Sequence, residues 1–145
     1  MPTRSAETTW NGGLQDGSGV VKLTSSGLGT FDVSFPKRAA EDGTGATSPE
    51  ELIAAAHSAC YAMQFSAMIA AAGGTPLEIS VSAKVTLSPD PQGGFHIPSI
   101  ELTVRGKVEG LDDAAFKVVA EEAKGSCPVS KALTGTSITL DAALI

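Results

Sequence analysis

The stretch TSPEELIAAAHSACYAMQFSAMIAAA, residues 47–72, decides the fold, because it predicts one long helix. Ser48 suits the N-cap position, and Pro49 suits the first helical position since its missing N–H is not needed there. Glu51 falls at the third helical position, where its carboxylate can accept a hydrogen bond from the N–H of the cap residue. The pair Gly73-Gly74 predicts that the helix ends at about Ala72.

The predicted helix is apolar on all sides from Leu52 to Ala72, and a helix of that kind has to be buried all round. It would span roughly 30 Å, about the diameter of a small domain, so one small domain cannot cover every face. We therefore expect it to pack against its equivalent in a second subunit, as the core of a two-fold dimer. A membrane span is disfavoured, because alanine predominates and His57, Ser58, Gln64 and Ser66 interrupt the segment.

Strands are predicted before this helix. Ala6 to Trp10 is short and extended, and Gly19 to Ser25 and Gly29 to Phe35 alternate like two half-buried strands of a hairpin. The segment from Pro36 to Thr47 is predicted to be a loop, and loops on a rigid scaffold often carry functional side chains.

After the helix, the pattern predicts a long antiparallel hairpin and then mixed elements. The hairpin strands are expected at Leu77 to Ser88 and at Ile100 to Val108. Asp112 should cap a second helix from Asp113 to Lys124, with Gly125 ending it. The remaining elements are a short helix that begins at Ser126-Cys127-Pro128 and runs through Leu133, and a final strand from Ser137 to Leu144. This order predicts an α+β fold, and the length of 145 residues fits a single domain over residues 1–145.

The amino-acid composition argues against some classes of binding partner. The chain has a formal net charge of -6, and no basic cluster is present, which argues against nucleic-acid and membrane-surface binding. The N-terminal residues are polar and show no signal peptide, so we expect a cytoplasmic location. The chain has two cysteines. In a reducing compartment these are either two buried small side chains or a working redox pair, and their number alone does not decide between the two.

Cys60 is a candidate nucleophile whose thiol requires a nearby positive charge in order to ionise. A thiol attacks as its thiolate, and burial within an apolar helix raises the pKa of such a thiol. Arg38, just before the helix, is the natural source of positive charge, since a guanidinium stays charged when partly buried. Glu50 has no predicted role in capping the helix, so its carboxylate is available to orient Arg38. Ten residues separate Glu50 from Cys60, about 15 Å along a helix, so we expect Arg38 and Glu50 to serve the Cys60 of a partner subunit.

Other chemistries remain open at this stage. Cys127 precedes Pro128 at a helix start, where exposed N–H groups favour a thiolate; the alternative is a helix-capping residue that happens to be a cysteine. His57 and Cys60 share a helix face, which permits a Cys–His dyad for acyl transfer. Zinc binding by His57, Cys60, His96 and Cys127 is disfavoured, because no close pair has the usual ligand spacing.

Two motifs resemble those of a known family. Residues 47–61, TSPEELIAAAHSACY, resemble the pattern T-N-P-E-E-L…A-A-x…A-C-F of the OsmC/Ohr family, and residues 125–130, GSCPVS, resemble its G-C-P-V-S motif. The spacing of the motifs and the order of elements agree over essentially the whole chain, and A-A-H-x-A-C resembles the OsmC branch. Ser48 stands where asparagine is usual, and Tyr61 stands where phenylalanine is usual.

The resemblance implies a role for each candidate residue. Cys60 matches the peroxidatic cysteine and Cys127 the resolving cysteine. Glu50 matches the carboxylate ten residues before the first cysteine, and Arg38 matches the activating arginine. It also implies an OsmC-like fold of antiparallel sheets around a long central helix, and an intertwined homodimer without metal, haem or other cofactor.

The activity implied is a thiol-dependent peroxidase for oxidative or osmotic stress defence. Such an enzyme reduces organic hydroperoxides, such as alkyl or lipid hydroperoxides, to alcohols. A Cys60 sulfenic acid then becomes a Cys60–Cys127 disulfide, which an external dithiol such as a lipoylated protein resets. The rival predictions are a redox-sensing or acyl-carrying protein, and a cysteine hydrolase that uses His57.

Overall fold

In the computed structural model, which describes residues 1–145, the predicted long helix is present as α2, Pro49–Ala71. Its start follows the prediction, because the Glu51 N–H donates to the Ser48 hydroxyl over 3.1 Å. The Glu51 carboxylate differs from the prediction. It accepts a hydrogen bond from the Thr47 hydroxyl at 2.7 Å, one residue before the cap. The Glu51 side chain therefore links Thr47, which precedes the cap residue, to the first turn of the helix.

The helix ends where the two glycines predict. Gly73 has a φ of 87°, in the left-handed region that favours glycine, and the Gly74 N–H donates to the Ile69 carbonyl over 3.0 Å. Hydrogen bonds of this kind satisfy the last carbonyl groups of the helix.

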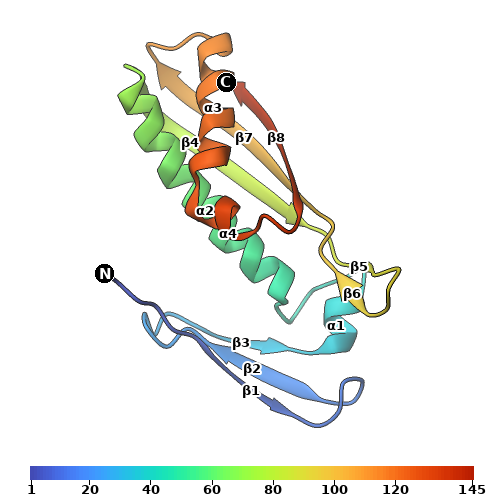
Figure 1. Ribbon diagram of the computed structural model, residues 1–145. Coiled ribbons are helices and arrows are strands. Elements are labelled where there is room, and N and C mark those ends of the chain that lie inside the picture. The colour runs from blue at the N-terminus through green and yellow to red at the C-terminus, as the bar shows by residue number, and fades with distance from the viewer. The chain divides into compact units, whose positions relative to one another are not determined.

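The chain forms two compact units, Met1–Leu52 and Ile53–Ile145. The first unit contains an antiparallel sheet in the order β1-β2-β3, as the strand patterns predict. Its strands are β1 Glu7–Asn11, β2 Ser18–Lys22 and β3 Thr30–Val33 (Figure 1).

A short helix, α1 Phe35–Ala39, replaces part of the predicted loop after β3. The Ser34 hydroxyl accepts from the Lys37 N–H at 3.3 Å, and Pro36 lies in the first turn. The prediction of a loop from Pro36 was therefore wrong at its beginning. The serine cap and the early proline are the same helix-start signals as at Ser48 and Pro49.

The second unit is built on a three-stranded sheet in the order β4-β7-β8. Strands β4 Thr75–Val85 and β7 Ser99–Glu109 pair antiparallel, as predicted, and β8 Ser137–Leu144 pairs parallel to β7. A minor hairpin of β5 Ser88–Pro89 and β6 Phe95–His96 lies within the connection from β4 to β7. The α+β class is confirmed, and the parallel β8 makes this sheet a mixed one.

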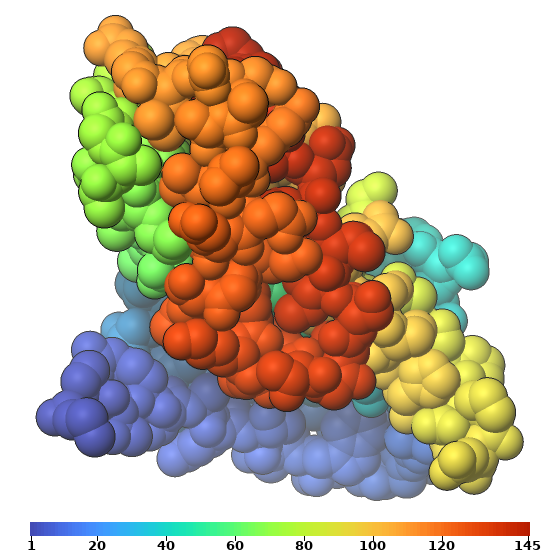
Figure 2. Space-filling view, turned by 45° about the horizontal axis from the view of Figure 1, so that its top comes forward, coloured from blue at the N-terminus to red at the C-terminus, as the bar shows by residue number.

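Two helices precede β8. Helix α3, Asp113–Ser126, begins at the predicted cap, where the Asp112 carboxylate accepts from the Ala115 N–H at 2.8 Å. It packs along β8 (Figures 1 and 2). The predicted end at Gly125 was wrong, because the helix continues through Ser126. Pro128 explains the later end, since a proline disfavours the helical conformation in the residue before it. Helix α4 is Pro128–Ala132.

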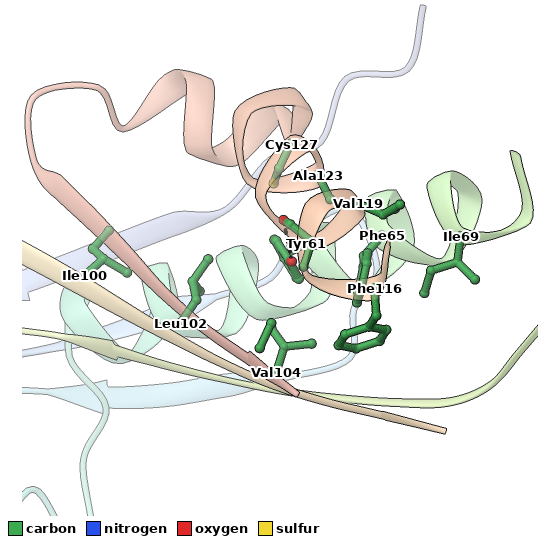
Figure 3. Close-up of a cluster of buried hydrophobic side chains, with 12 residues drawn as sticks. Tyr61, Phe65, Ile69, Ile100, Leu102, Val104, Phe116, Val119, Ala123 and Cys127 are labelled. Carbon is green, nitrogen blue, oxygen red and sulfur yellow. Dashed lines mark hydrogen bonds between the residues drawn. The ribbon is translucent and has the colours of Figure 1, made fainter. Parts of the chain in front are cut away.

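The core of the second unit lies between α2, α3 and the sheet. Tyr61, Phe65 and Ile69, one helical turn apart on α2, are fully buried together with Ile100, Leu102 and Val104 of β7 and Phe116 of α3 (Figure 3). The rings of Phe65 and Phe116 meet edge to face, with centroids 5.0 Å apart. A side chain at Gly106 would come within 2.8 Å of the Phe116 ring, so this glycine permits the close approach of helix and strand.

The opposite face of α2 within this unit is exposed. It consists of small or apolar side chains at helical spacing: Ala55, Ala56, Ala59, Met63, Ala67 and Ala70. Met63 is 70% exposed. Helix α2 is also long and apolar enough to cross a membrane, judged by length and composition alone. The single chain therefore covers only one face of the helix that the sequence predicts to be buried all round.

The Tyr61 hydroxyl provides a first test of the core. It donates a buried hydrogen bond to the Ala120 carbonyl over 2.8 Å, joining α2 to α3. We expect Tyr61→Phe to lower the free energy of unfolding by about 1 kcal/mol, the usual net value of one such bond. Urea unfolding with an unchanged m-value measures this loss. Equal stability of the two proteins would show that the bond does not hold the helices together.

Candidate active site

The two cysteines meet, although 67 positions separate them in the sequence. Cys60 lies in the middle of α2 and Cys127 at the junction of α3 and α4, and their Sγ atoms are 3.3 Å apart. Both thiols are free. A disulfide bond is about 2.05 Å long, so a small movement of either side chain would bring the sulfurs to bonding distance.

The backbone around Cys127 holds its side chain toward α2. The Cys127 N–H donates to the Ala123 carbonyl over 2.9 Å, which closes α3, and the Cys127 carbonyl accepts from the Lys131 N–H at 3.0 Å, which opens α4. Cys127 itself is extended, with φ -59° and ψ 122°. It thus ends one helix and begins the next, and its side chain is fully buried near Tyr61 and Ala123 (Figure 3).

The two thiols differ in acidity. Burial raises the pKa of the Cys60 thiol, and the Val129 N–H only partly opposes this effect. Burial also raises the pKa of the Cys127 thiol, but the polar groups near the sulfur, among them the Ser130 N–H and the Cys60 thiol, outweigh this effect, so that this pKa lies below its ordinary value. Within this unit, Cys127 is therefore the readier thiolate. The raised pKa of Cys60 is what the sequence predicts for a buried thiol that has no positive charge beside it.

Arg38 and Glu50 form the ion pair that the sequence predicts. The Arg38 Nη2 donates to Glu50 Oε1 over 2.7 Å, and Nε lies 3.1 Å from both carboxylate oxygens. Glu50 lies in the first turn of α2 and is buried, whereas the Arg38 side chain is 31% exposed. A paired contact of this kind fixes the plane of the guanidinium. The contact with Glu50 uses Nε and Nη2 and leaves Nη1 outside it.

An apolar pocket adjoins the guanidinium within the first unit. It has a volume of about 350 Å³ and is lined by side chains of the sheet, of α1 and of the start of α2: Thr8, Trp10, Leu14, Val21, Val33, Ser34, Phe35, Arg38, Thr47, Pro49 and Leu52. Arg38 is the one charged residue of this lining. The pocket can therefore take an apolar group while the guanidinium meets a polar or anionic atom at its edge.

His57 bonds to Ser130, a residue that was not predicted from the sequence to belong to the site. Its ring is fully buried, and Nε2 lies 2.7 Å from the Ser130 hydroxyl. Nδ1 has no partner, so no carboxylate orients the ring as a hydrolase dyad requires. Neither ring nitrogen bonds to Cys60, so the Cys–His dyad that the sequence left open is not formed. The signal for Ser130 lay in the motif GSCPVS, three residues after Cys127.

His96 lies apart from these groups. Its Nδ1 atom pairs with Asp90 at 3.2 Å within the β5–β6 connection. No three His, Cys, Asp or Glu side chains lie close enough together to hold a metal ion. The four residues weighed for zinc binding thus do not gather at one place.

Buried His57 predicts a pH dependence of stability. Burial lowers the pKa of its imidazole, so the ring is neutral in the folded chain. The unfolded chain binds a proton there below about pH 6.5, and stability therefore falls as pH falls through that range. We expect this residue to contribute at most ~1.4 kcal/mol per pH unit between pH 7 and pH 5.

Urea unfolding at several pH values measures that contribution. In His57→Gln the contribution should vanish, whereas His96→Gln is the matched control and should keep it. The same pH slope in His57→Gln and in the unmodified chain would contradict the neutral, buried state of the ring.

Comparison with known proteins agrees with the fold and with the two cysteine motifs. The family model described as OsmC-like protein matches residues 41–142. The chain belongs to the OsmC family.

Relatives within that family are similar over most of their length. Peroxiredoxin OsmC of Escherichia coli (strain K12) is 38% identical over 138 residues, which is 95% of this chain and 94% of that protein. Organic hydroperoxide resistance protein OhrA of Bacillus subtilis (strain 168) is 34% identical over 101 residues, 68% of each chain.

Solved structures show the same fold. An organic hydroperoxide resistance protein from Elizabethkingia anophelis, crystallised with thiocyanate bound, has a TM-score of 0.80 at 30% identity and covers 100% of this chain and 98% of its own. An OsmC organic hydroperoxide resistance protein from Legionella pneumophila has a TM-score of 0.79 at 26% identity and covers 99% and 98%. The similarity therefore includes both ends of the chain.

Proposed function

We propose that this protein is a cysteine-based peroxidase that reduces organic hydroperoxides in stress defence. The names of its relatives, a peroxiredoxin and several organic hydroperoxide resistance proteins, support a peroxidase. The observation that carries the proposal is the 3.3 Å separation of the Cys60 and Cys127 sulfurs, which come from different elements. Two free thiols at that distance can exchange between reduced and disulfide states without refolding.

The proposed cycle has three steps. The Cys60 thiolate attacks the terminal oxygen of the hydroperoxide, the O–O bond breaks, and an alcohol leaves after taking a proton, so that Cys60 becomes a sulfenic acid. The Cys127 thiolate then attacks the Cys60 sulfur, the S–S bond forms and the S–O bond breaks, and the hydroxide leaves as water. An external dithiol, such as a lipoyl group, reduces the disulfide by thiol exchange and is itself oxidised to a disulfide.

Arg38 and Glu50 are proposed to activate Cys60. The pKa of the Cys60 thiol is raised by burial, so the thiol needs a positive charge beside it to ionise near neutral pH. Arg38 is suited to that task, since Glu50 holds the guanidinium through Nε and Nη2, and Nη1 lies outside that contact. In this proposal, the guanidinium stabilises the thiolate and polarises the O–O bond, and it serves the Cys60 of a partner subunit.

A homodimer is proposed because α2 has an uncovered apolar face. Ala55, Ala59 and Met63 lie exposed along it, and the neighbouring small side chains allow another helix to approach closely. Burial of this face against its own copy would satisfy the all-round apolar character of the helix.

The pocket beside Arg38 supports an apolar substrate. Its walls are mainly aliphatic and aromatic, so the alkyl part of a hydroperoxide would fit there better than hydrogen peroxide, which has none.

The proposed cycle uses thiols and an external dithiol, and calls for no metal, haem or other cofactor. A cycle reset by dithiols suits the cytoplasm, where thiols are kept reduced. The net charge of -6 gives no support to nucleic acid as a partner.

A turnover experiment separates this function from a redox sensor. We expect the protein, with excess dithiol, to consume many equivalents of cumene hydroperoxide per chain. A sensor would oxidise once per chain and stop. Consumption that ends at one equivalent while dithiol remains would overturn the proposal.

A further inference from the structure

A buried hydrogen bond lies beside the two cysteines, and the proposed cycle does not use it. The His57 Nε2 atom on α2 lies 2.7 Å from the Ser130 hydroxyl on α4. The His57 side chain is fully buried, and Ser130 is 6% exposed. Because both partners are buried, the loss of one would leave the other without a hydrogen bond to water in its place. The bond therefore joins α2 to α4 through a contact that is costly to break.

The bond lies at the same level of the two helices as the pair of sulfurs. His57 precedes Cys60 by three residues on α2, so the two side chains share a helix face. Ser130 follows Cys127 by three residues, and the Lys131 N–H donates to the Cys127 carbonyl over 3.0 Å. That backbone bond joins Cys127 to the first turn of α4. Each partner of the buried bond is thus three residues from one of the sulfurs, which are 3.3 Å apart.

Helix α4 requires a directional contact to hold its position. It has only five residues, too few to be stable alone, so its position depends on contacts with the rest of the unit. Val129 and Leu133 pack against the core, but apolar contacts have no preferred direction. The Cys127 side chain makes no capping hydrogen bond to α4. Since hydrogen bonds are directional, the His57–Ser130 bond can set the position of α4, and of Cys127 with it, relative to α2.

The other ring nitrogen of His57 shows which partner donates. Nδ1 is buried and has no partner, so a hydrogen on that atom would be a buried donor without an acceptor. The single hydrogen of the neutral ring is therefore on Nε2, which donates to the Ser130 oxygen. A glutamine amide at position 57 can donate in the same way, whereas leucine fills the space without a donor.

We propose that the His57–Ser130 bond positions the two cysteine sulfurs for disulfide formation. His57 and Ser130 are positioning residues, because they act through the placement of α4. The use of this geometry in the resolving step, attack of Cys127 on a Cys60 sulfenic acid, rests on the proposed function. In that step the S–S bond forms, the S–O bond breaks, and the departing hydroxide takes a proton from solvent to leave as water.

Oxidation of the full chain by dithiothreitol at equilibrium tests the proposal without peroxide. Oxidised dithiothreitol takes two electrons and two protons from the thiol pair, and the ratio of disulfide to dithiol protein gives an equilibrium constant. Sulfurs that are already held together lose less freedom when they join, so this constant is larger. We expect Ser130→Ala and His57→Leu each to lower it about tenfold, which raises the reduction potential by about 30 mV. His57→Gln should keep the constant, because it keeps the donor.

Two controls separate position from a general loosening of the core. Phe116→Leu removes the edge-to-face contact with Phe65 near the start of α3, away from Cys127 at the end of that helix. It should lower stability in urea and leave the equilibrium constant unchanged. The double variant of His57→Leu with Ser130→Ala should lower the constant no more than either single change, because both remove the same bond.

Each outcome supports or overturns the proposal. An unchanged constant in Ser130→Ala would overturn it, and so would an equal fall in Phe116→Leu. Equal falls in His57→Leu and His57→Gln would also overturn it, because glutamine retains the donor. Circular dichroism identifies a variant that fails to fold. Should His57→Leu fail, Ser130→Ala and His57→Gln still carry the test.

A measurement with peroxide separates a failure of this proposal from a failure of the proposed function. After one equivalent of cumene hydroperoxide, trapping by dimedone follows the Cys60 sulfenic acid, which should persist about tenfold longer in Ser130→Ala than in the unmodified chain. Equal lifetimes would contradict the positioning role. Absence of any sulfenic acid or disulfide would contradict the peroxidase, while the equilibrium with dithiothreitol would still report on the His57–Ser130 bond.

Discussion

Substitution of Cys60 by serine is expected to reduce dithiol-dependent consumption of cumene hydroperoxide to the uncatalysed rate, a loss of at least about a thousandfold. The serine hydroxyl is close in size to the thiol but does not ionise near neutral pH, so the O–O bond meets no nucleophile. The core around position 60 should be little disturbed. Kinetics under excess dithiol measure the loss, and circular dichroism checks the fold.

Cys127→Ser is the matched control, because it removes the other sulfur and leaves the first chemical step intact. It should still react with one equivalent of peroxide at Cys60. Without a resolving thiol, Cys60 should then oxidise further to sulfinic acid under repeated peroxide. Peroxidase turnover retained by Cys60→Ser, or an equal loss of the first step in both variants, would contradict the assignment of roles.

Substitution of Arg38 by methionine is expected to lower the rate of the first step about a hundredfold at pH 7. Burial raises the pKa of the Cys60 thiol, and the proposed role of the guanidinium is to oppose that effect. Without it the thiol should ionise at higher pH, so the rate should recover as pH rises. Single-turnover reaction of peroxide with Cys60 across pH measures this shift.

Two further variants sharpen the Arg38 test. Glu50→Gln keeps the guanidinium but removes the charge that orients it, so its loss should be smaller. Arg105→Met is a matched control, because Arg105 pairs with Asp141 at 2.9 Å on the exposed side of the sheet. A pH profile unchanged by Arg38→Met, or changed as much by Arg105→Met, would contradict the role of Arg38.

Mixed dimers test whether Arg38 serves the partner's cysteine. A chain with Arg38→Met keeps Cys60, and a chain with Cys60→Ser keeps Arg38. If the two residues act across the dimer, joint refolding of equal amounts should restore about a quarter of full activity, since half of the dimers are mixed and each holds one complete site. No recovery on mixing would place both residues of a site in one chain.

Local signals allowed much of the fold to be predicted from the sequence. Ser48 and Pro49 mark the start of α2, and Gly73 marks its end, because caps and left-handed glycines act within one helical turn. The same reasoning failed at Gly125, where α3 continues. Glycine weakens a helix but does not end it unless the chain needs a left-handed residue there, and Pro128 supplies the actual stop.

The candidate site was predictable only in part. The Arg38–Glu50 pair could be predicted because Glu51 already had a task at the helix start and Glu50 did not. The contact of Cys60 with Cys127 could not be computed from spacing, and came only from the family resemblance. The His57–Ser130 bond was missed, since it joins residues 73 positions apart and depends on how α4 packs on α2.

The identity of the bond formed after oxidation tests the central claim most directly. The reduced protein is treated with one equivalent of cumene hydroperoxide without dithiol, and its intact mass, free thiols and peptides are measured. We predict a loss of two hydrogen atoms per chain, no free thiol, and one peptide pair that joins Cys60 to Cys127 within a single chain. Two thiols that stay free, or a disulfide that links two chains instead, would contradict the account.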